Sequence, residues 1–276
     1  MALDQYQEEE EGMSFLDHLE ALRWHLLRSV AAILIFTVAA FLAKSIVFGV
    51  IILGPSKVDF FTYRVLCDIG NSLGISALCI DELPFTIQSR QMTGQFSMHM
   101  TSSFVVGFIA AFPYVFWEVW KFISPALYEK ERKYAVSFII VSSFLFFVGV
   151  LFGYYLIAPL SVQFFASYIV SPEISNSIDI NSYISLMKTS AIASGLLFEL
   201  PIIIFFLTKI GLVTPEFLRK YRKYTLVIVL IVAAVITPPD VLSQIIVSIP
   251  IMILYEASIL ISVLVVKSQE REKLKA

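Results

Sequence analysis

A carboxyl group inside a long apolar run is the residue of this sequence whose type and place most clearly indicate chemistry. Glu199 lies about ten residues before Lys209, which corresponds to roughly 15 Å of helix and to the middle of a membrane-spanning segment. A carboxyl at that depth costs about 2.5–3.5 kcal/mol, so we expect it to face protein or water rather than lipid. Two interpretations stay open: a protonated glutamic acid bonded to a neighbouring helix, or a polar contact point inside a docking or translocation cavity. Pro201, two residues later, favours a kink.

Two further carboxyl groups in apolar runs give weaker signals. Glu118 stands three residues before Lys121, and we expect it to snorkel toward the interface beside that lysine. Glu256 lies in the last apolar run and is a second, weaker example of a carboxyl group at membrane depth.

The turn Thr237-Pro238-Pro239-Asp240 separates the last two apolar runs. The two prolines end one helix, and the Asp240 carboxylate can cap the next helix by accepting a hydrogen bond from the amide of Ser243. A rigid hairpin with no further role and a functional turn that includes Gln244 both fit this pattern.

Cys67 and Cys79 are the only cysteines, and both fall in a loop that we place outside the membrane on the non-cytoplasmic side. A disulfide closing a loop this short would contribute about 3 kcal/mol in an oxidising compartment. Two free, buried thiols are the alternative interpretation.

Motifs of enzymes are absent from the sequence. The three histidines, His18, His25 and His99, form no HExxH pair, and there is neither a Gly-rich phosphate loop with Lys-Ser/Thr nor a Gly-x-Ser-x-Gly turn. We therefore predict no enzymatic activity, no cofactor and no metal site. The net charge of −2 gives no indication of nucleic-acid binding.

The elements that must position these residues are membrane-spanning helices. Hydrophobic residues make up 58% of the 276 positions and charged residues 15%, which is outside the range of soluble domains. Helices satisfy their own backbone polar groups in lipid, so we predict an all-α integral membrane protein with six transmembrane helices. The six apolar runs lie at about 24–54, 96–121, 134–158, 183–208, 223–237 and 241–266. Only the fifth run is short, because 14 residues give about 21 Å of helix against a bilayer core of about 30 Å.

The basic residues predict the orientation. Fifteen of the 20 lysines and arginines lie near the start of the first run, in or at the edges of the second and fourth connections, or after the last run. Lysine and arginine concentrate in cytoplasmic segments, so both termini are predicted to be cytoplasmic. The five exceptions are Lys44, Lys57, Arg64, Arg90 and Lys188.

The chain divides into three parts. Residues 1–13 are predicted to be an acidic disordered tail with no cleavable signal peptide, residues 14–267 a six-span membrane domain, and residues 268–276 a charged cytoplasmic tail. Residues 14–28 have the spacing of a short amphipathic helix, with Ser14 and Asp17 as a capping box. The aromatic-containing segment 55–95 is expected to form an ordered outer cap.

Four motifs, in order along residues 14–267, resemble those of the TatC family, the multispanning receptor subunit of the twin-arginine protein translocase. The segment Phe122-Ile-Ser-Pro125-Ala-Leu127-Tyr-Glu-Lys-Glu131-Arg132 matches the family pattern Phe-x-x-Pro-x-Leu-x-x-x-Glu-Arg. The other three motifs are His18-Leu-Glu20-Ala21-Leu-Arg23, Phe198-Glu199-Leu-Pro201, and Thr237-Pro-Pro-Asp240 followed by Ser243-Gln244.

The resemblance implies a function in the cell inner membrane. Members bind twin-arginine signal peptides of folded precursors on the cytoplasmic face and assemble a passage with single-span TatA/TatB-type subunits, further copies of themselves and membrane lipid, driven by the proton-motive force. On this basis the signal-peptide residues are expected to be Glu20, Arg23, Phe122, Pro125, Leu127, Glu131 and Arg132, and the intramembrane docking residues Glu199, Asp240 and Gln244. Carboxylates suit this ligand because they take bidentate hydrogen bonds from guanidinium groups.

One position departs from the family pattern. The family glutamate aligns with Ala21, and Glu20 stands one residue earlier, which turns its side chain by about 100° around a helix. We therefore expect Glu20 to replace the family residue poorly and Glu131 to carry more of the binding.

Two other function classes remain as alternatives. A small-solute or ion transporter would use Glu199 as an intramembrane site, but the sequence has no internal repeat of the kind many carriers show. An intramembrane hydrolase would need a nucleophile and a base at membrane depth, and no such pair stands out.

Overall fold

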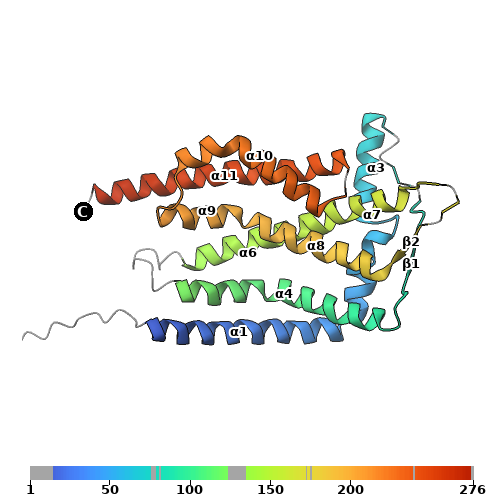
Figure 1. Ribbon diagram of the computed structural model, residues 1–276, viewed down its shortest axis with the longest axis horizontal. Helices are drawn as coiled ribbons and strands as arrows, with labels where there is room; N and C mark the ends of the chain where they lie inside the picture. The colour runs from blue at the N-terminus through green and yellow to red at the C-terminus, as the bar shows by residue number, and fades with distance from the viewer. Residues whose placement is uncertain are drawn as a thin grey trace, which may run out of the picture.

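The computed structural model describes residues 15–75, 79–80, 82–123, 135–171, 173–174, 176–238 and 240–274. Long helices run side by side along the long axis of the molecule (Figure 1). They are α1 (Phe15–Leu42), α4 (Gly94–Ile123), α6 (Ala135–Phe152), α8 (Ile180–Phe198), α9 (Leu200–Lys209), α10 (Pro215–Ile236) and α11 (Val241–Lys273).

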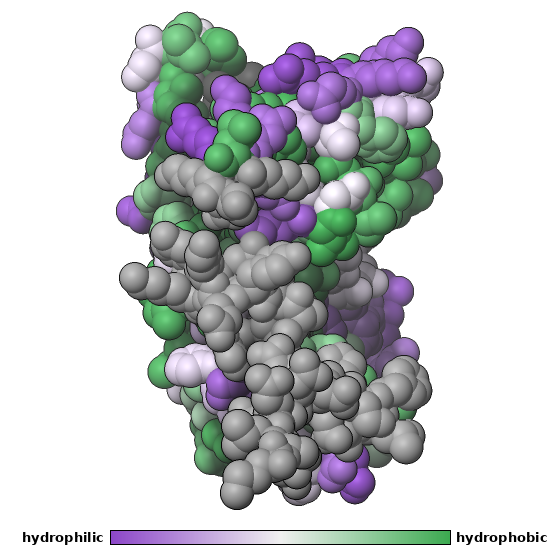
Figure 2. Space-filling model, turned by 90° about the vertical axis from the view of Figure 1, so that its left-hand side faces the viewer, coloured by the Kyte–Doolittle hydropathy of each residue, from purple (hydrophilic) through white to green (hydrophobic). Residues whose placement is uncertain are grey.

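The two ends of this bundle differ. The first residues of α1 and the last residues of α11 lie at one end, which we call the charged end (Figure 1). Hydrophilic side chains gather at the top of this end, and hydrophobic side chains show at its sides (Figure 2). The opposite end, the cap end, carries α3 (Phe61–Leu73) and two short strands.

Within the described part of the chain, five helical segments are long and apolar enough to cross a membrane: Leu19–Leu42, Gly94–Phe122, Val136–Ser167, Ile180–Lys209 and Ser243–Arg271. The expected fifth span is part of α10, which has 22 residues and so measures about 33 Å. This helix is longer than predicted because it begins at Pro215, before the basic residues Arg219, Lys220, Arg222 and Lys223, which lie within its first three turns. Only its apolar part is short.

The predicted first span was wrong at its C-terminal end. The helix α1 stops at Leu42 rather than near residue 54, and the chain continues through α2 (Lys44–Ile46), a π-helical turn (Val47–Ile52) and a 3-10 turn (Gly54–Ser56). These turns run across the cap end instead of along the bundle (Figure 1). The 24-residue span that ends at Leu42 already gives about 36 Å of helix, and the exposed Lys44 follows two residues later. The short amphipathic helix predicted for residues 14–28 is continuous with the first span, because α1 runs unbroken from Phe15 to Leu42, and Ser14 lies outside the described residues.

The ends of two other helical segments also differ from the predicted positions. The third span continues past residue 158, through a π-helical turn (Gly153–Ile157) into α7 (Ala158–Ser167). The helix α11 extends to Lys273, beyond the predicted boundary at 267.

Close packing of α6 on α8 depends on two glycines. A Cβ atom at Gly149 would come within 2.7 Å of the Ser194 carbonyl oxygen, and one at Gly153 would overlap the Ser190 carbonyl. The absence of side chains at these two positions therefore lets the α6 span approach the backbone of α8.

The expected outer cap is ordered, and it contains a feature that the sequence did not predict. The strands β1 (Thr86–Gln88) and β2 (Ser177–Asp179) form a parallel pair in which Ile87 lies opposite Ile178. The pair thus joins the two loops at the cap end. The Tyr63 hydroxyl on α3 donates to the carbonyl oxygens of Pro55 and Pro159, at 3.0 and 3.1 Å, and its burial raises its pKa. This tyrosine fixes α3 to the bundle.

Candidate functional site

Glu118 forms the centre of a polar junction at the charged end. Its carboxylate is 1% exposed and lies 2.6 Å from Nδ1 of His25 on α1. Arg28 Nη1 stands 3.9 Å from the same carboxylate oxygen, and Lys121 Nζ stands 3.6 Å from the other. Three basic side chains thus surround one buried carboxylate, and this junction joins the first turns of α1 to the last turns of α4.

Phe122 belongs to the same junction. Its ring lies edge-on to the His25 imidazole, with 6.3 Å between the ring centroids. The structure therefore brings one predicted signal-peptide residue, at the end of α4, beside α1. The segment that follows α4 contains Pro125, Leu127, Glu131 and Arg132, and these four predicted residues lie outside the described residues.

The face of α1 that turns to α4 contains Ala21 rather than Glu20. Ala21 precedes His25 by four residues, so the two positions share one face of the helix. Glu20 is exposed, as is Arg23, and one residue corresponds to a rotation of about 100°. The carboxylate of Glu20 is thus turned away from the face that carries His25.

Glu118 is the residue that sequence reasoning missed. We expected it to snorkel beside Lys121, and it is buried instead. The available signal was the spacing of His25 and Arg28, which stand three residues apart and so present two basic groups on one face of α1. The sequence does not show which carboxylate lies opposite this face. That became visible only in the structure, where α1 packs against α4.

Glu199 lies at a break between two helices in the middle of the fourth span. The helix α8 ends and α9 begins at this residue, two positions before Pro201. The side chain is 7% exposed, and its Oε2 accepts a hydrogen bond of 2.6 Å from the Ser142 hydroxyl on α6. Its Oε1 is buried with no hydrogen-bond partner among the residues that the structure describes. One oxygen of this carboxyl group therefore has a hydrogen-bond partner among the described residues, and the other oxygen has none.

Asp240 and Gln244 fix the turn between α10 and α11. The Asp240 carboxylate accepts a hydrogen bond of 2.9 Å from the amide of Ser243, and the Gln244 side-chain amide donates to the Leu230 carbonyl oxygen at 2.9 Å. Gln244 therefore contacts α10, whereas Glu199 contacts α6. The structure does not place these two predicted docking residues in one hydrogen-bond network.

Glu256, the weaker candidate on α11, has a basic partner. Its carboxylate accepts a hydrogen bond of 2.6 Å from Arg222 on α10, and both side chains are about half exposed. An exposed ion pair of this kind contributes little to stability.

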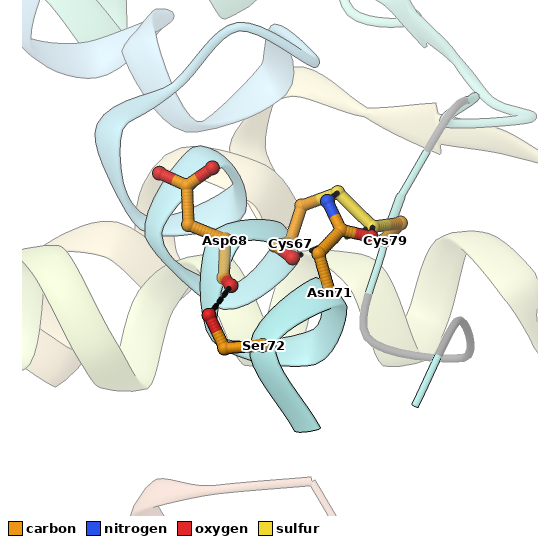
Figure 3. The surroundings of a disulfide bond; sticks show 5 residues. All are labelled: Cys67, Asp68, Asn71, Ser72 and Cys79. Carbon is orange, nitrogen blue, oxygen red and sulfur yellow. Dashed lines mark hydrogen bonds between the residues drawn. A yellow bond between two sulfur atoms is a disulfide. The ribbon is translucent and has the colours of Figure 1, made fainter. Parts of the chain in front are cut away.

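Cys67 and Cys79 form a disulfide at the cap end. Cys67 lies on α3, and Cys79 comes from the segment that passes beside this helix (Figure 3). The Asp68 side chain points away from the disulfide, and the Ser72 hydroxyl donates to the Asp68 carbonyl oxygen at 2.9 Å (Figure 3). The bond ties the middle of α3 to the loop that leads to β1.

Comparisons with known proteins agree over most of the chain. Residues 17–250 match the family model described as Sec-independent protein translocase protein (TatC). The Sec-independent protein translocase protein TatC of Blattabacterium sp. subsp. Periplaneta americana (strain BPLAN) is 43% identical over 263 residues, covering 95% of this chain and 99% of the relative. The TatCy protein of Bacillus subtilis (strain 168) is 37% identical over 251 residues, covering 91% and 89%.

A solved structure shares the fold. The crystal structure of the twin-arginine translocase receptor TatC in the detergent DDM matches with a TM-score of 0.68 and 31% identity, over 89% of this chain and 99% of the other.

The fold defines a multi-pass, mainly helical membrane protein with a buried polar junction at its charged end and a buried carboxyl group at mid-span. Within that class of membrane proteins, the family model and the similar proteins all point to one family. The chain belongs to the TatC family.

Proposed function

We propose that this chain is the core subunit of a twin-arginine translocase in the cell inner membrane, with both termini in the cytoplasm. The charged end binds the twin-arginine signal peptides of folded precursor proteins. Single-span TatA/TatB-type subunits and further copies of the chain then assemble at the membrane-spanning part, and the proton-motive force drives transport. Membership of the family supports this proposal, as does the distribution of basic residues.

The junction between α1 and α4 is the observation that carries the proposal. Glu118 holds His25 at 2.6 Å, and Phe122 lies against the same imidazole. The start of α1, with Glu20 and Arg23, therefore lies beside the point where the chain leaves α4 toward Glu131. An apolar ring beside carboxylates suits a signal peptide, which carries two guanidinium groups and a hydrophobic segment.

Glu118 has a positioning role in this proposal. Its carboxylate already faces His25, Arg28 and Lys121, so it is not left to pair with the arginines of a ligand. It fixes the angle at which α1 enters the membrane relative to α4. The carboxylates that bind the signal peptide are then the exposed ones, with Glu131 contributing more than Glu20.

The second part of the proposal concerns partner docking at mid-span. The free oxygen of Glu199 can accept a hydrogen bond from a polar side chain on a partner helix, and burial makes such a bond valuable because the alternative is an unsatisfied group. The turn with Asp240 and Gln244 shapes the adjoining helices α10 and α11 at the cap end.

Site-directed crosslinking tests the proposal. A photo-reactive residue in place of Phe122 should crosslink to a twin-arginine signal peptide, and the yield should fall when both arginines of the peptide are replaced by lysine. The same probe in place of Val235, an exposed residue at the cap end of α10, is the matched control and should give no crosslink. Equal yields at the two positions, or equal yields with the two peptides, would contradict the proposal.

A further inference from the structure

An open cavity of about 600 Å³ lies at the cap end, between α4, α8 and the last turn of α10. Five polar residues of α8 line it: Asn181, Ser182, Ser185, Lys188 and Thr189. Ser182, Ser185 and Thr189 recur at intervals of three and four residues, so they follow one face of the helix, and all three are exposed. A membrane-spanning helix thus presents a polar stripe to its surroundings, which is unfavourable in lipid unless a polar partner fills the space.

Lys188 gives the cavity a positive charge. Its ammonium donates a hydrogen bond of 3.1 Å to the Thr101 hydroxyl on α4. Among the residues that the structure describes, no carboxylate lies within ion-pair distance of this ammonium. The nearby Asp179 is engaged elsewhere, because it accepts hydrogen bonds from Asn181 and from the backbone N–H of Arg90.

We infer the depth of Lys188 in the bilayer from its place on α8, near the cap end of the fourth span. The residue follows the start of α8 at Ile180 by eight positions, which corresponds to about 12 Å of helix. A lysine side chain at such a depth extends toward the interface and places its ammonium near the headgroups. The ammonium is therefore within reach of a lipid headgroup from the leaflet around the cap end.

The remaining wall of the cavity is apolar. Met98, Leu186, Val235 and Ile236 line it, and Val235 is 80% exposed. A cavity with a cation and several hydroxyls on one side and aliphatic side chains on the other fits an amphipathic molecule. Ammonium and hydroxyl groups together bind phosphate oxygens through charge-assisted hydrogen bonds.

We propose that this cavity binds the phosphodiester headgroup of a phospholipid, with Lys188 as the principal ligand and Thr101 and the α8 hydroxyls as supporting donors. The acyl chains then lie along the apolar wall formed by α8 and α10. An acidic side chain from another membrane helix is the competing occupant, and the depth of the ammonium and the aliphatic wall favour the lipid. The inference is independent of signal-peptide binding, since the cavity lies at the opposite end of the molecule from Glu118 and Phe122.

Native mass spectrometry of the delipidated full-length protein, titrated with dioleoyl phosphatidylglycerol, tests this site. Lys188→Met should weaken the tightest binding event about tenfold, because one charge-assisted hydrogen bond is lost. Lys57→Met is the matched control: it removes an exposed lysine at the same end, outside the cavity, and should leave that binding event unchanged. Thr101→Val should have a smaller effect in the same direction as Lys188→Met.

Two further ligands separate the possible sources of binding. Dioleoylglycerol has the same acyl chains without phosphate and should bind much more weakly, whereas inorganic phosphate alone should not compete with the phospholipid at equal concentration. Equal affinity of the wild-type protein and Lys188→Met, or equal binding of dioleoylglycerol, would overturn the proposal. Occupancy by an acidic single-span peptide that phospholipid cannot displace would overturn it in favour of a protein partner.

Discussion

Glu118 and Glu199 are both buried carboxyl groups on membrane-spanning helices, yet their surroundings differ. Glu118 faces His25, Arg28 and Lys121 at the charged end, whereas Glu199 receives one hydrogen bond from Ser142 and leaves its second oxygen without a partner among the described residues. A carboxylate with three basic neighbours is compensated within the chain. A carboxyl group with one hydroxyl neighbour is not, and it is the better candidate for contact with another molecule.

Removing the compensated carboxylate should have the largest effect on stability. We expect Glu118→Ala to lower the free energy of unfolding by about 1–3 kcal/mol, because three basic groups then lose their shared partner. We expect a loss near the lower end of this range. Arg28 and Lys121 are about half exposed, so solvent screens their interaction with the Glu118 carboxylate. Thermal unfolding in detergent measures the change, and Glu256→Ala, at an exposed ion pair, is the control. A melting temperature of Glu118→Ala equal to that of the control would show that the junction does not stabilise the fold.

Removing the uncompensated carboxyl group should affect association instead. Glu199→Ala deletes one hydrogen bond but also one unsatisfied buried oxygen, so we expect little change in the melting temperature. Association with a single-span partner subunit should weaken by up to about tenfold, the equivalent of one hydrogen bond. The measurement is co-purification or fluorescence binding in detergent, again beside Glu256→Ala. A Glu199→Ala protein that fails to accumulate in the membrane would favour a purely structural glutamic acid.

The disulfide should be independent of both carboxyl groups, because it lies at the cap end. In protein from an oxidising compartment, thiol labelling after unfolding without reductant should find no free cysteine at positions 67 and 79. The Cys67→Ser and Cys79→Ser double variant should keep wild-type binding of signal peptides. Two labelled thiols per chain would end the assignment of a disulfide in the cell.

The smallest expected effect concerns Asp179 at the start of α8. Hydrogen bonds from the backbone and side chain of Asn181, with the nearby Arg90, hold the pKa of Asp179 below its ordinary value. A carboxyl whose pKa is depressed by folding contributes stability above its ordinary pKa of about 3.9, and that stability is lost as the pH falls through the lower folded value. The protection factors of the β1–β2 amides, which correct for the intrinsic pH dependence of hydrogen exchange, should therefore fall at acid pH in the wild type. Asp179→Asn should show less of this pH dependence, and an identical profile in the two proteins would count against the role of Asp179.

Much of the architecture could be predicted from the sequence, because membrane-spanning helices need long apolar runs and basic residues mark their ends. The boundaries were less predictable. Nothing in the local sequence before Lys44 showed that the chain would turn at residue 43, and the basic first turns of α10 did not show that the helix would continue through them. The parallel pairing of β1 and β2 joins residues about 90 positions apart, so no local pattern could indicate it.

The candidate sites were predictable to different degrees. Glu199 could be found because a carboxyl group in an apolar run is unusual wherever its neighbours lie. Glu118 was misread, since its burial depends on His25, which lies 93 positions away in the sequence. Helix geometry alone predicted that Glu20 is turned by about 100° from position 21, but only the structure showed that position 21 lies on the side of α1 that faces α4.

The central claim is that the charged end recognises the arginines of a signal peptide mainly through Glu131, and one measurement tests it most directly. Glu131→Gln keeps the side-chain shape and removes the charge. Binding of a twin-arginine peptide to the purified protein, measured at two ionic strengths, should weaken about ten- to a hundredfold, since a charge-assisted hydrogen bond is worth about 1.5–3 kcal/mol. A surface charge contributes only about 0–1 kcal/mol to folding, so the melting temperature should barely change. Glu20→Gln should have a smaller effect on binding. Unchanged peptide binding by Glu131→Gln, with an unchanged melt, would contradict the assignment of the charged end as the receptor site.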